Sequence, residues 1–251
     1  MREKDTYFIK MNKKNFVSII ITYYKKKKYL AKTLKSISDQ SFKNFEIIFV
    51  YDDKDKNDLK FVKKQIKRFK KKKLIINKIN LGVSKSRNLA LKYCKGDFIS
   101  FIDADDMWKK NKLFEQIKFM KKKTSLFCFT SYEIIDEFDN VLGLRRVDSD
   151  ASYDTLSKSN YIGLSTVLVH KKIASKIRFP NLQTQEDLCL WLKLLKQNVK
   201  LHHYSKILSS WRKTENSLSS KTTRKLIDAF KLFYIYENKN FIFSVFSVLV
   251  L

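Results

Sequence analysis

A chain of 251 residues, 44% of them hydrophobic, can bury a sizeable core, so wholesale disorder is excluded. The net charge of +28 is compatible with nucleic-acid binding, but the excess is mostly lysine, in separate runs at 25–28, 70–73 and 121–123. Because arginine carries most bidentate recognition of bases, this pattern favours a solvated surface that meets an anionic membrane or anionic substrates, and no specific nucleic acid.

The cysteines and the two ends of the chain bear on the compartment. Cys94, Cys128 and Cys189 are isolated, so neither a disulfide framework nor a zinc site is predicted, and a reducing compartment fits. Residues 1–5 carry charges where a signal peptide needs its apolar core, so we expect a cytoplasmic protein. Residues 241–251 form an apolar run that is too short to span a bilayer, which takes about 20 residues. Three fates stay open for this run: packing on the domain, lying in a membrane interface, or beginning a longer segment.

Short apolar runs alternate with helical patterns in the first hundred residues. Strands are predicted at 16–22, 45–51, 74–77 and 98–102, and helices at 29–40, 57–69 and 84–93. This alternation, with nearly continuous apolar strands, indicates βαβ units and a mainly parallel sheet.

The alternation loosens in the second half of the chain. The patterns predict a helix at 109–120, a strand at 126–130, a hairpin at 131–147, a strand at 163–170, a helix at 186–197, a strand at 199–204 and a basic helix at 222–238. With four Gly and one Pro no linker is evident, so we expect an extension at 1–15, one domain at 16–220 and a basic helix with an apolar tail at 221–251.

Three carboxylates follow the predicted strand 98–102, namely Asp103, Asp105 and Asp106. Ligands of open α/β sheets bind beyond the carboxyl ends of the strands, and clustered acids need solvent or a cation with oxygen ligands as neutraliser. A calcium loop is excluded, because Trp108 and Phe114 stand where it needs Gly and Glu. Helix capping by one acid stays open. Three acids exceed that need, so a metal or phosphate site is favoured.

Two other predicted strands end in residues that suit a nucleotide. The first ends in Thr22, Tyr23 and Tyr24, and the second is followed by Asp52. An aromatic ring for stacking, a carboxylate for a base or ribose, and a metal-holding acid for a diphosphate together make a complete nucleotide-diphosphate site.

Five segments recur with the order and spacing of a known family. They are Val17–Tyr24, Ser36–Ile48, Asn80–Asn88, Gly96–Asp106 and Gln185–Trp191. Over roughly residues 16–220 the sequence resembles the family 2 glycosyltransferases, which have the GT-A fold. The resemblance implies an α/β, Rossmann-like domain with a central, mainly parallel sheet flanked by helices, with a nucleotide-binding half at 16–106 and an acceptor-binding half at 107–220.

The resemblance also assigns roles in the nucleotide-binding half. Thr22, Tyr24 and Asp52 would cradle the nucleoside, and Arg87 would approach the nucleotide. Asp103 and Asp105 would form the DxD motif that binds ribose and metal, with Asp106 assisting at the metal. Two departures matter: Thr22 replaces the common Pro, and Lys25 replaces the common Asn. Tyr51 stands where the first of two acids often lies, so Asp52 is the acid expected to bind the base.

In the second half, Glu186-Asp187 matches the family's acidic pair, whose Asp is the general base. From the residues alone, helix capping is the simpler reading of this pair. Trp211-Arg212 with Ser217 resembles a late element near the diphosphate, but Thr214 stands where His is frequent.

The implied activity is that of a metal-dependent, inverting glycosyltransferase with Mn²⁺ or Mg²⁺. The expected donor is a nucleotide-diphosphate sugar, with a UDP-sugar favoured, and the acceptor is a surface glycan or a lipid-linked sugar of the cell envelope. The basic surface and apolar tail suit peripheral contact with the inner face of a membrane.

Two alternatives stay open from the residues. One is a nucleotide-sugar pyrophosphorylase, which usually carries a Gly-rich phosphate loop where this chain has Lys25–Lys28. The other is a basic nucleic-acid binding protein, which the net charge alone supports.

Overall fold

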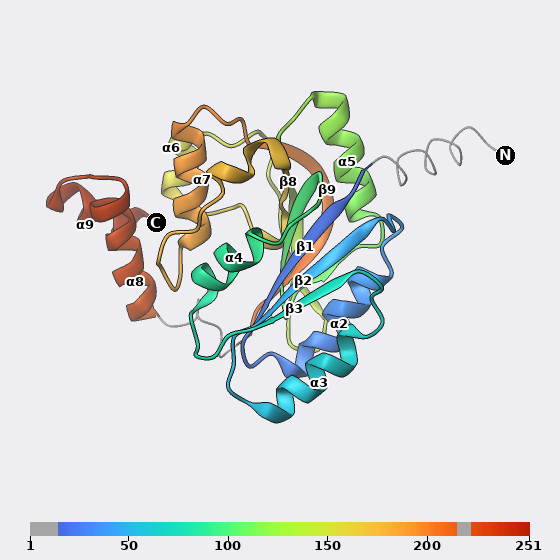
Figure 1. Cartoon of the computed structure of the whole chain (residues 1–251). Helices are drawn as coiled ribbons and strands as arrows, with labels where there is room; N and C mark the ends of the chain where they lie inside the picture. Colours follow the sequence, from blue (N-terminus) through green and yellow to red (C-terminus); the bar gives the residue numbers. More distant parts are fainter. Residues whose placement is uncertain (1–14, 215–221) are drawn as a thin grey trace.

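The computed structural model describes residues 15–214 and 222–251, and its centre is one mixed sheet (Figure 1). The strands are β1 (Val17–Tyr23), β2 (Phe45–Tyr51), β3 (Lys72–Ile76), β4 (Phe98–Asp103), β5 (Met107–Trp108), β6 (Phe127–Ile135), β7 (Val141–Arg145), β8 (Leu168–His170) and β9 (His202–Arg212). The α-helices are α2 (Lys27–Ser38), α3 (Lys56–Ile66), α4 (Val83–Leu91), α5 (Lys112–Lys123), α6 (Tyr153–Lys158), α7 (Glu186–Lys196), α8 (Thr222–Lys231) and α9 (Phe241–Val250).

The first half of the sheet is parallel, as the alternation of strands and helices predicts. Strand β1 lies between β2 and β4, and β3 pairs with the outer side of β2. Thr22 of β1 lies opposite Val50 of β2 and Asp103 of β4. The carboxyl ends of these three strands therefore meet at one edge of the sheet.

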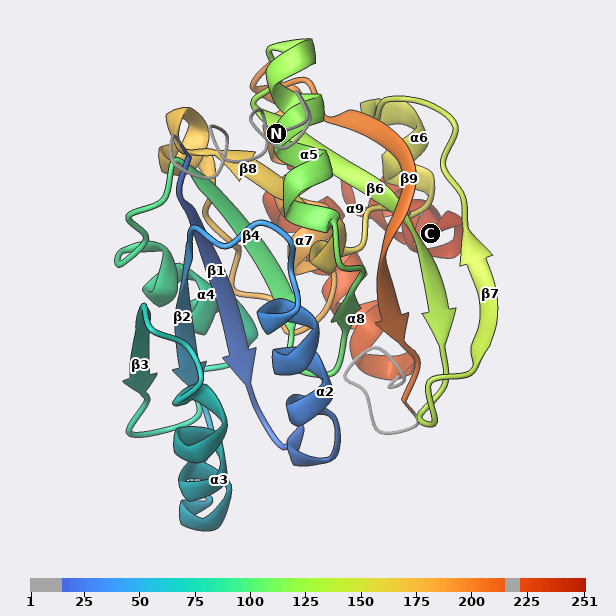
Figure 2. The ribbon, with the colours of Figure 1, turned by 90° about the vertical axis from the view of Figure 1, so that its right-hand side faces the viewer.

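The second half of the sheet mixes directions. Strand β8 is antiparallel to both β4 and β6, and β9 runs parallel to β6. Strand β5 is antiparallel to the end of β9, and β7 pairs with β6 at the outer edge (Figure 2). The sheet is continuous from β3 to β5, so it passes through both predicted halves of the domain.

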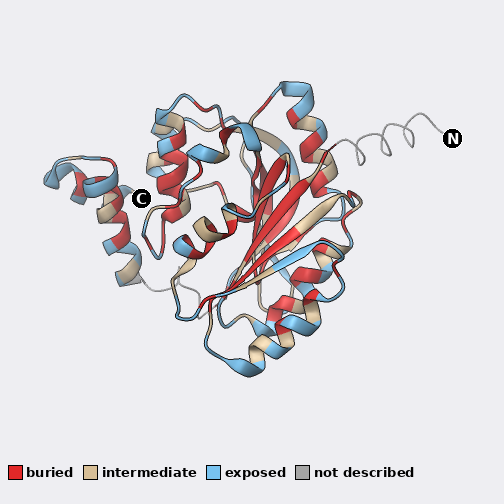
Figure 3. Cartoon of the chain, viewed as in Figure 1, coloured by how far each residue is buried: buried red, intermediate tan, exposed pale blue. Residues whose placement is uncertain are grey.

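Helices cover both faces of the sheet, and the side-chain alternation of the strands separates two cores. Ile19 and Ile21 of β1 pack in the core beneath α2, α3 and α5, whereas Ile20 packs in the core beneath α4 and α7. The strands β1, β2 and β4 are largely buried between these layers, whereas the edge strand β3 is partly exposed (Figure 3). This arrangement explains why the strands read as continuous apolar runs.

A glycine allows β1 to approach the turn before β4. A Cβ atom on Gly96 would lie 2.4 Å from the backbone nitrogen of Ser18 and 2.5 Å from the carbonyl oxygen of Phe98. Any other residue at this position must push the start of β4 away from β1.

Most predicted elements are present; three predictions need correction, and α6 had not been predicted. The strand predicted at 163–170 is wrong in its first part: residues Leu164–Thr166 form a 3-10 turn, because the hydroxyl and N–H of Thr166 both donate to the carbonyl of Gly163, and only Leu168–His170 is a strand. The strand predicted at 199–204 begins at His202 and continues to Arg212. The short α6, whose cap Ser152 accepts the N–H of Thr155, was not predicted. The basic helix predicted at 222–238 becomes a π-helix (η4) at Leu232–Tyr236.

The apolar tail is the helix α9, which follows η4 at the end of the chain. Among residues 15–214 and 222–251, no helix is both long and apolar enough to cross a membrane.

Candidate active site

A buried arginine joins the end of β4 to the start of α7. Nη2 of Arg87 lies 2.7 Å from Oδ1 of Asp103, and Nη1 lies 2.5 Å from Oε1 of Glu186. Burial alone lowers the pKa of Arg87, but the two carboxylates outweigh it, so the guanidinium stays charged. Arg87 was expected to approach the nucleotide; in the structure it bridges Asp103 to Glu186, which lies 99 residues after the arginine itself.

Asp105, in the loop that follows β4, forms an ion pair with a lysine. Lys26, the residue before α2, places Nζ 2.6 Å from Oδ2 of Asp105 and also reaches the hydroxyl of Thr214. Burial raises the pKa of Asp105, and the charge of Lys26 opposes that rise. The ammonium shows that the local field at Asp105 attracts a cation.

The third acid of the loop is held by hydrogen bonds through both of its oxygens. Asp106 accepts the hydroxyl of Ser165 at 2.5 Å through Oδ2 and the N–H of Arg212 at 2.9 Å through Oδ1. Ser165 in turn accepts the N–H of Asp103. The side chain is 2% exposed, and burial raises its pKa well above the ordinary value. Asp106 therefore anchors the loop to the 3-10 turn Leu164–Thr166 and to β9, and both of its oxygens accept hydrogen bonds from the chain.

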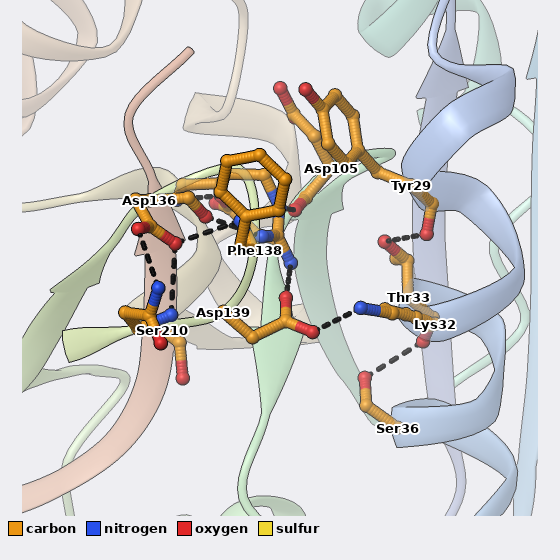
Figure 4. Close-up of polar contacts among 12 residues, drawn as sticks. Tyr29, Lys32, Thr33, Ser36, Asp105, Asp136, Phe138, Asp139 and Ser210 are labelled. Atoms are coloured by element: carbon orange, nitrogen blue, oxygen red, sulfur yellow. Dashed lines mark hydrogen bonds and ion pairs between the residues drawn. The ribbon is translucent and has the colours of Figure 1, made fainter.

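Arg212 donates a hydrogen bond to the backbone of the same loop, which follows β4. Its Nε donates to the carbonyl of Asp105 and its Nη1 to the carbonyl of Asp136, and Nη2 lies 2.5 Å from Oδ1 of Asp139. Asp139, at the tip of the β6–β7 hairpin, also pairs with Lys32 of α2 (Figure 4). Arg212 was expected near the diphosphate. In the structure it is 2% exposed, and its hydrogen bonds stabilise the loop that carries Asp105 and Asp106.

The two acids at the start of α7 have different surroundings. Glu186 is buried beside Arg87, and burial raises its pKa to about 7 even though Arg87 opposes the rise. Asp187 is partly exposed; Asn160 and the N–H of Leu188 donate to its Oδ1 only, as far as the described residues go. Burial raises the pKa of Asp187 too, again against the charge of Arg87. A partly exposed carboxylate with one oxygen open and a raised pKa can accept a proton.

The acid after β2 holds a loop. Asp52 is 3% exposed; Oδ1 accepts from Asn77 and the N–H of Leu81, and Oδ2 accepts the N–H of Gly82. Gly82 has φ +81°, a conformation that disfavours other residues, and it caps α4. Asp52 was expected to bind the base, and here both carboxylate oxygens are engaged by the chain. A cavity of about 290 Å³ lies between this loop and residues 181–183.

The residues at the end of β1 are the most accessible of the set. Thr22 is half-buried and Tyr24 is 43% exposed, with Nζ of Lys25 5.2 Å from the centroid of the Tyr24 ring. Tyr23 points inward, stacks on Tyr51 and donates to Asp58. An exposed ring beside a cation is a surface on which a base can stack.

The structure brings together Asp103, Arg87 and Glu186 by direct contact, and it places Asp105 with Lys26 beside them. Sequence reasoning missed Lys26, Asn160 and Ser165. Lys26 lies in the lysine run that follows the first strand, which was the available signal; Asn160 and Ser165 lie in segments without a motif. Ser217 lies outside the described residues.

Comparisons with known proteins point to one family. Residues 18–174 match the model of "Glycosyl transferase family 2". TuaG of Bacillus subtilis (strain 168), named for teichuronic acid biosynthesis, is 30% identical over 228 residues, which cover 90% of this chain and 89% of TuaG. WfgD of Escherichia coli, a UDP-Glc:α-D-GlcNAc-diphosphoundecaprenol β-1,3-glucosyltransferase, is 33% identical over 215 residues, which cover 84% of this chain and 82% of WfgD.

A solved structure shares the fold at low sequence identity. The mannosyltransferase PcManGT from Pyrobaculum calidifontis, in complex with GDP-Man and Mn²⁺, is 12% identical, with a TM-score of 0.69 over 96% of this chain and 76% of PcManGT. These matches and the sheet described above confirm the predicted GT-A fold, and they give no support to a pyrophosphorylase or a nucleic-acid binding protein. The chain belongs to glycosyl transferase family 2.

Proposed function

We propose that this chain transfers a sugar from a nucleotide-diphosphate sugar to an acceptor hydroxyl, with inversion at the anomeric carbon and Asp187 as general base. The observation that carries the proposal is the bridge through Arg87. It fixes the start of α7, and with it Asp187, against the acid at the end of β4. A base and a donor site on separate elements are thereby held at a constant separation, which an in-line displacement needs.

The donor side of the site is the carboxyl edge of β1, β2 and β4. Tyr24 offers a stacking surface for the base, Thr22 lies beside it, and Asp52 shapes the Asn80–Gly82 loop that borders the 290 Å³ cavity. A UDP-sugar is the favoured donor, because the relative WfgD is named for UDP-Glc. Asp103 keeps Oδ2 clear of hydrogen bonds from the described residues, and we assign it to the donor's ribose.

The donor set fits a divalent cation of the Mn²⁺ or Mg²⁺ kind. No cluster of three His, Cys, Asp or Glu side chains that could hold a metal is present within the described ranges, so the protein would supply Asp105, with Asp103 beside it. Mg²⁺ is commonly held by one or two protein carboxylates, and substrate phosphates complete its coordination. Asp105 and Asp103 can supply those carboxylates. The ammonium of Lys26 on Asp105 marks the same spot as attractive to a cation. A bound cation supplies charge neutralisation for the leaving diphosphate.

The chain's own residues then carry the transfer. Asp187 takes the proton of the acceptor hydroxyl while the acceptor oxygen attacks the anomeric carbon on the face opposite the diphosphate. The new carbon–oxygen bond forms as the bond to the diphosphate breaks, so the configuration inverts. Asn160 and the N–H of Leu188 orient Asp187, while Arg87 and Glu186 keep the first turn of α7 in place.

The acceptor is assigned to the surface-glycan and lipid-linked classes. TuaG is named for a surface polysaccharide, and WfgD for a diphosphoundecaprenol acceptor. A cytoplasmic protein at the inner face of the membrane fits such acceptors.

The test incubates the purified chain with UDP-sugars and a diphosphoprenyl-sugar acceptor, with and without MnCl₂. A product with the anomeric configuration opposite to that of the donor, read from the NMR coupling constant, supports the proposal. Retention of configuration, or UDP-sugar hydrolysis that the acceptor does not change, contradicts it. For the cation, Asp105→Ala should abolish metal-dependent donor binding in calorimetry while the fold survives, because Asp103 is assigned to the ribose and Asp106 accepts hydrogen bonds from Ser165 and Arg212.

A further inference from the structure

In α9 the polar side chains face the protein and large apolar side chains face outward, which is the reverse of the order expected in water. Its two serines, Ser244 and Ser247, are buried against the body, whereas the side chains on the outer face are apolar. Ile242 is 81% exposed, Phe246 64% and Leu249 78%. An amphipathic helix on a water-soluble surface shows the opposite order, so the outer face of α9 is built for a non-aqueous neighbour.

The helices before α9 extend the same surface. Leu226 and Ile227 of α8, and Tyr234, Ile235 and Tyr236 of η4, are each more than 40% exposed. Figure 1 shows α8 and α9 together at one edge of the molecule, outside α6 and α7. We call the exposed apolar side chains of α8, η4 and α9 the C-terminal face.

Buried acids hold this segment on the domain. Asp228 of α8 accepts the N–H groups of Gln183 and Thr184 and the hydroxyl of Thr184. Glu237 pairs with Lys196 of α7 at 2.6 Å and accepts the hydroxyl of Tyr153. Leu232 and Phe233 are inserted in the core beneath. The C-terminal face is therefore fixed in orientation.

The exposed charged side chains of residues 222–251 are all basic. Asp228 and Glu237 are the two acids within 222–251, and both are buried by these contacts. The basic side chains of the same stretch, Arg224, Lys225, Lys231 and Lys239, are partly or fully exposed. An apolar helix flanked by exposed cations, without an exposed acid, matches an anionic lipid surface.

We propose that the C-terminal face docks on an anionic membrane surface, with α9 lying in the plane of the interface. A helix of ten residues is about 15 Å long, which suits an in-plane position and not a span. A second copy of the chain is the less suitable occupant, because pairing would bring two surfaces of the same sign together in a protein of net charge +28.

The segment that carries the docking surface contacts residues just before the proposed base, Asp187. The residues that Asp228 holds, Gln183 and Thr184, lie within four residues of Asp187. This step of the inference rests on the proposed function. The contact places the start of α7 at a set position relative to the lipid surface, where a lipid-linked acceptor presents its sugar.

The test is co-sedimentation of the full chain with sucrose-loaded vesicles of phosphatidylcholine, alone or mixed with phosphatidylglycerol, at moderate and high salt. The variants are Ile242→Glu, Phe246→Glu and Leu249→Glu. Leu142→Glu is the matched control, because Leu142 is 57% exposed on β7, outside the C-terminal face. Arg224→Gln with Lys225→Gln tests the charge.

Strong binding to the anionic vesicles is expected for the wild type and for Leu142→Glu. The partition coefficient should fall about tenfold or more in Phe246→Glu, and about fivefold for each basic side chain removed. Equal binding by wild type and Phe246→Glu overturns the proposal. A dimer in sedimentation velocity that Phe246→Glu converts to a monomer, with no vesicle binding, assigns the face to a second copy and overturns it as well.

A second assay separates this inference from the proposed function. Transfer to a short-chain, water-soluble acceptor should be unchanged in Phe246→Glu. Vesicle binding without any transfer activity contradicts the proposed function alone, and transfer without vesicle binding contradicts the docking surface alone.

Discussion

Lys26 and Asp105 form an ion pair of 2.6 Å at the position proposed for a divalent cation. A single carboxylate oxygen cannot serve an ammonium and a metal ion equally well. A metal ion bound through Oδ2 of Asp105 would therefore compete with the ammonium of Lys26.

This competition predicts that Lys26→Ala binds Mn²⁺ more tightly in the absence of donor. The gain is about fivefold, corresponding to an ion-pair interaction of about 1 kcal/mol. Electron paramagnetic resonance of free Mn²⁺ measures the affinity, and Lys25→Ala is the control, because Lys25 lies over Tyr24 and not on Asp105. Weaker Mn²⁺ binding in Lys26→Ala would show that the lysine assists the metal site.

Asp187→Asn should lose about 10²–10⁴-fold in turnover and keep donor affinity, because the amide retains the shape but cannot accept a proton. Burial raises the pKa of Asp187, so the wild-type rate should fall with decreasing pH at a pH above the range of an ordinary aspartate. Steady-state kinetics across pH and calorimetry of donor binding check both points.

The neighbouring acid separates the two roles. Glu186→Gln should be milder in turnover, since Glu186 is buried against Arg87 and does not reach the acceptor side. A dead Glu186→Gln together with an active Asp187→Asn would assign the base to Glu186.

Arg87→Met should lower the free energy of unfolding by about 3–5 kcal/mol, because it leaves Asp103 and Glu186 without their shared counter-ion. The loss should shrink as the pH falls through about 7, since protonation then neutralises Glu186, whose pKa burial raises to about 7. Urea unfolding at pH 5 and pH 8 measures this, with Lys85→Met, an exposed position on the same helix, as the control. A loss of donor affinity without a loss of stability would restore the direct nucleotide contact that the sequence suggests.

Lys112 is fully buried on α5, with Nζ 3.2 Å from the hydroxyl of Ser100 and 4.2 Å from the centroid of the Trp108 ring. Burial lowers its pKa to about 7. Between about pH 7 and 10 the unfolded chain holds this proton and the folded chain does not, so stability should rise with pH across that window and be flat below it.

Lys112→Met should remove this contribution to the pH dependence and raise stability at pH 7. Thermal and urea unfolding of the variant from pH 6 to pH 10 test it, beside Lys118→Met, an exposed position on α5. A stability profile of Lys112→Met that parallels the wild type in slope would mean that Lys112 keeps its proton in the fold.

The parallel half of the sheet could be predicted because β1, β2 and β4 are largely buried between two layers of helices and are therefore mostly apolar. The same regularity brought Thr22, Asp52 and Asp103 to one edge, since carboxyl ends of parallel neighbours coincide. Local patterns failed where a few polar contacts decide the backbone. Gly163 and Thr166 replace the start of a predicted strand by a turn, and no hydrophobic period reports such a hydrogen bond.

The site shows the same division. The acids could be located from their motifs, whereas their partners depend on how distant loops pack. Arg87 contacts Glu186 across 99 residues of sequence, and Ser165 contacts Asp106 across 59. Whether a carboxylate of the site is open to a ligand is therefore a tertiary property. Asp52 and Asp106 have both oxygens engaged by the chain, whereas Oδ2 of Asp187 receives no hydrogen bond from the part of the chain that the structure describes.

The hydrogen bond from Arg212 to Asp106 also has a consequence for synthesis on the ribosome. It joins residues 106 positions apart, and β9 pairs with β5 directly after the acidic loop. A nascent chain that has emerged as far as Asp106 carries every acid of the proposed donor side, but β9, which fixes the loop, has not yet been synthesised. The contact is non-local, so it forms late, and the loop of Asp105 and Asp106 is fixed only when β9 joins the sheet.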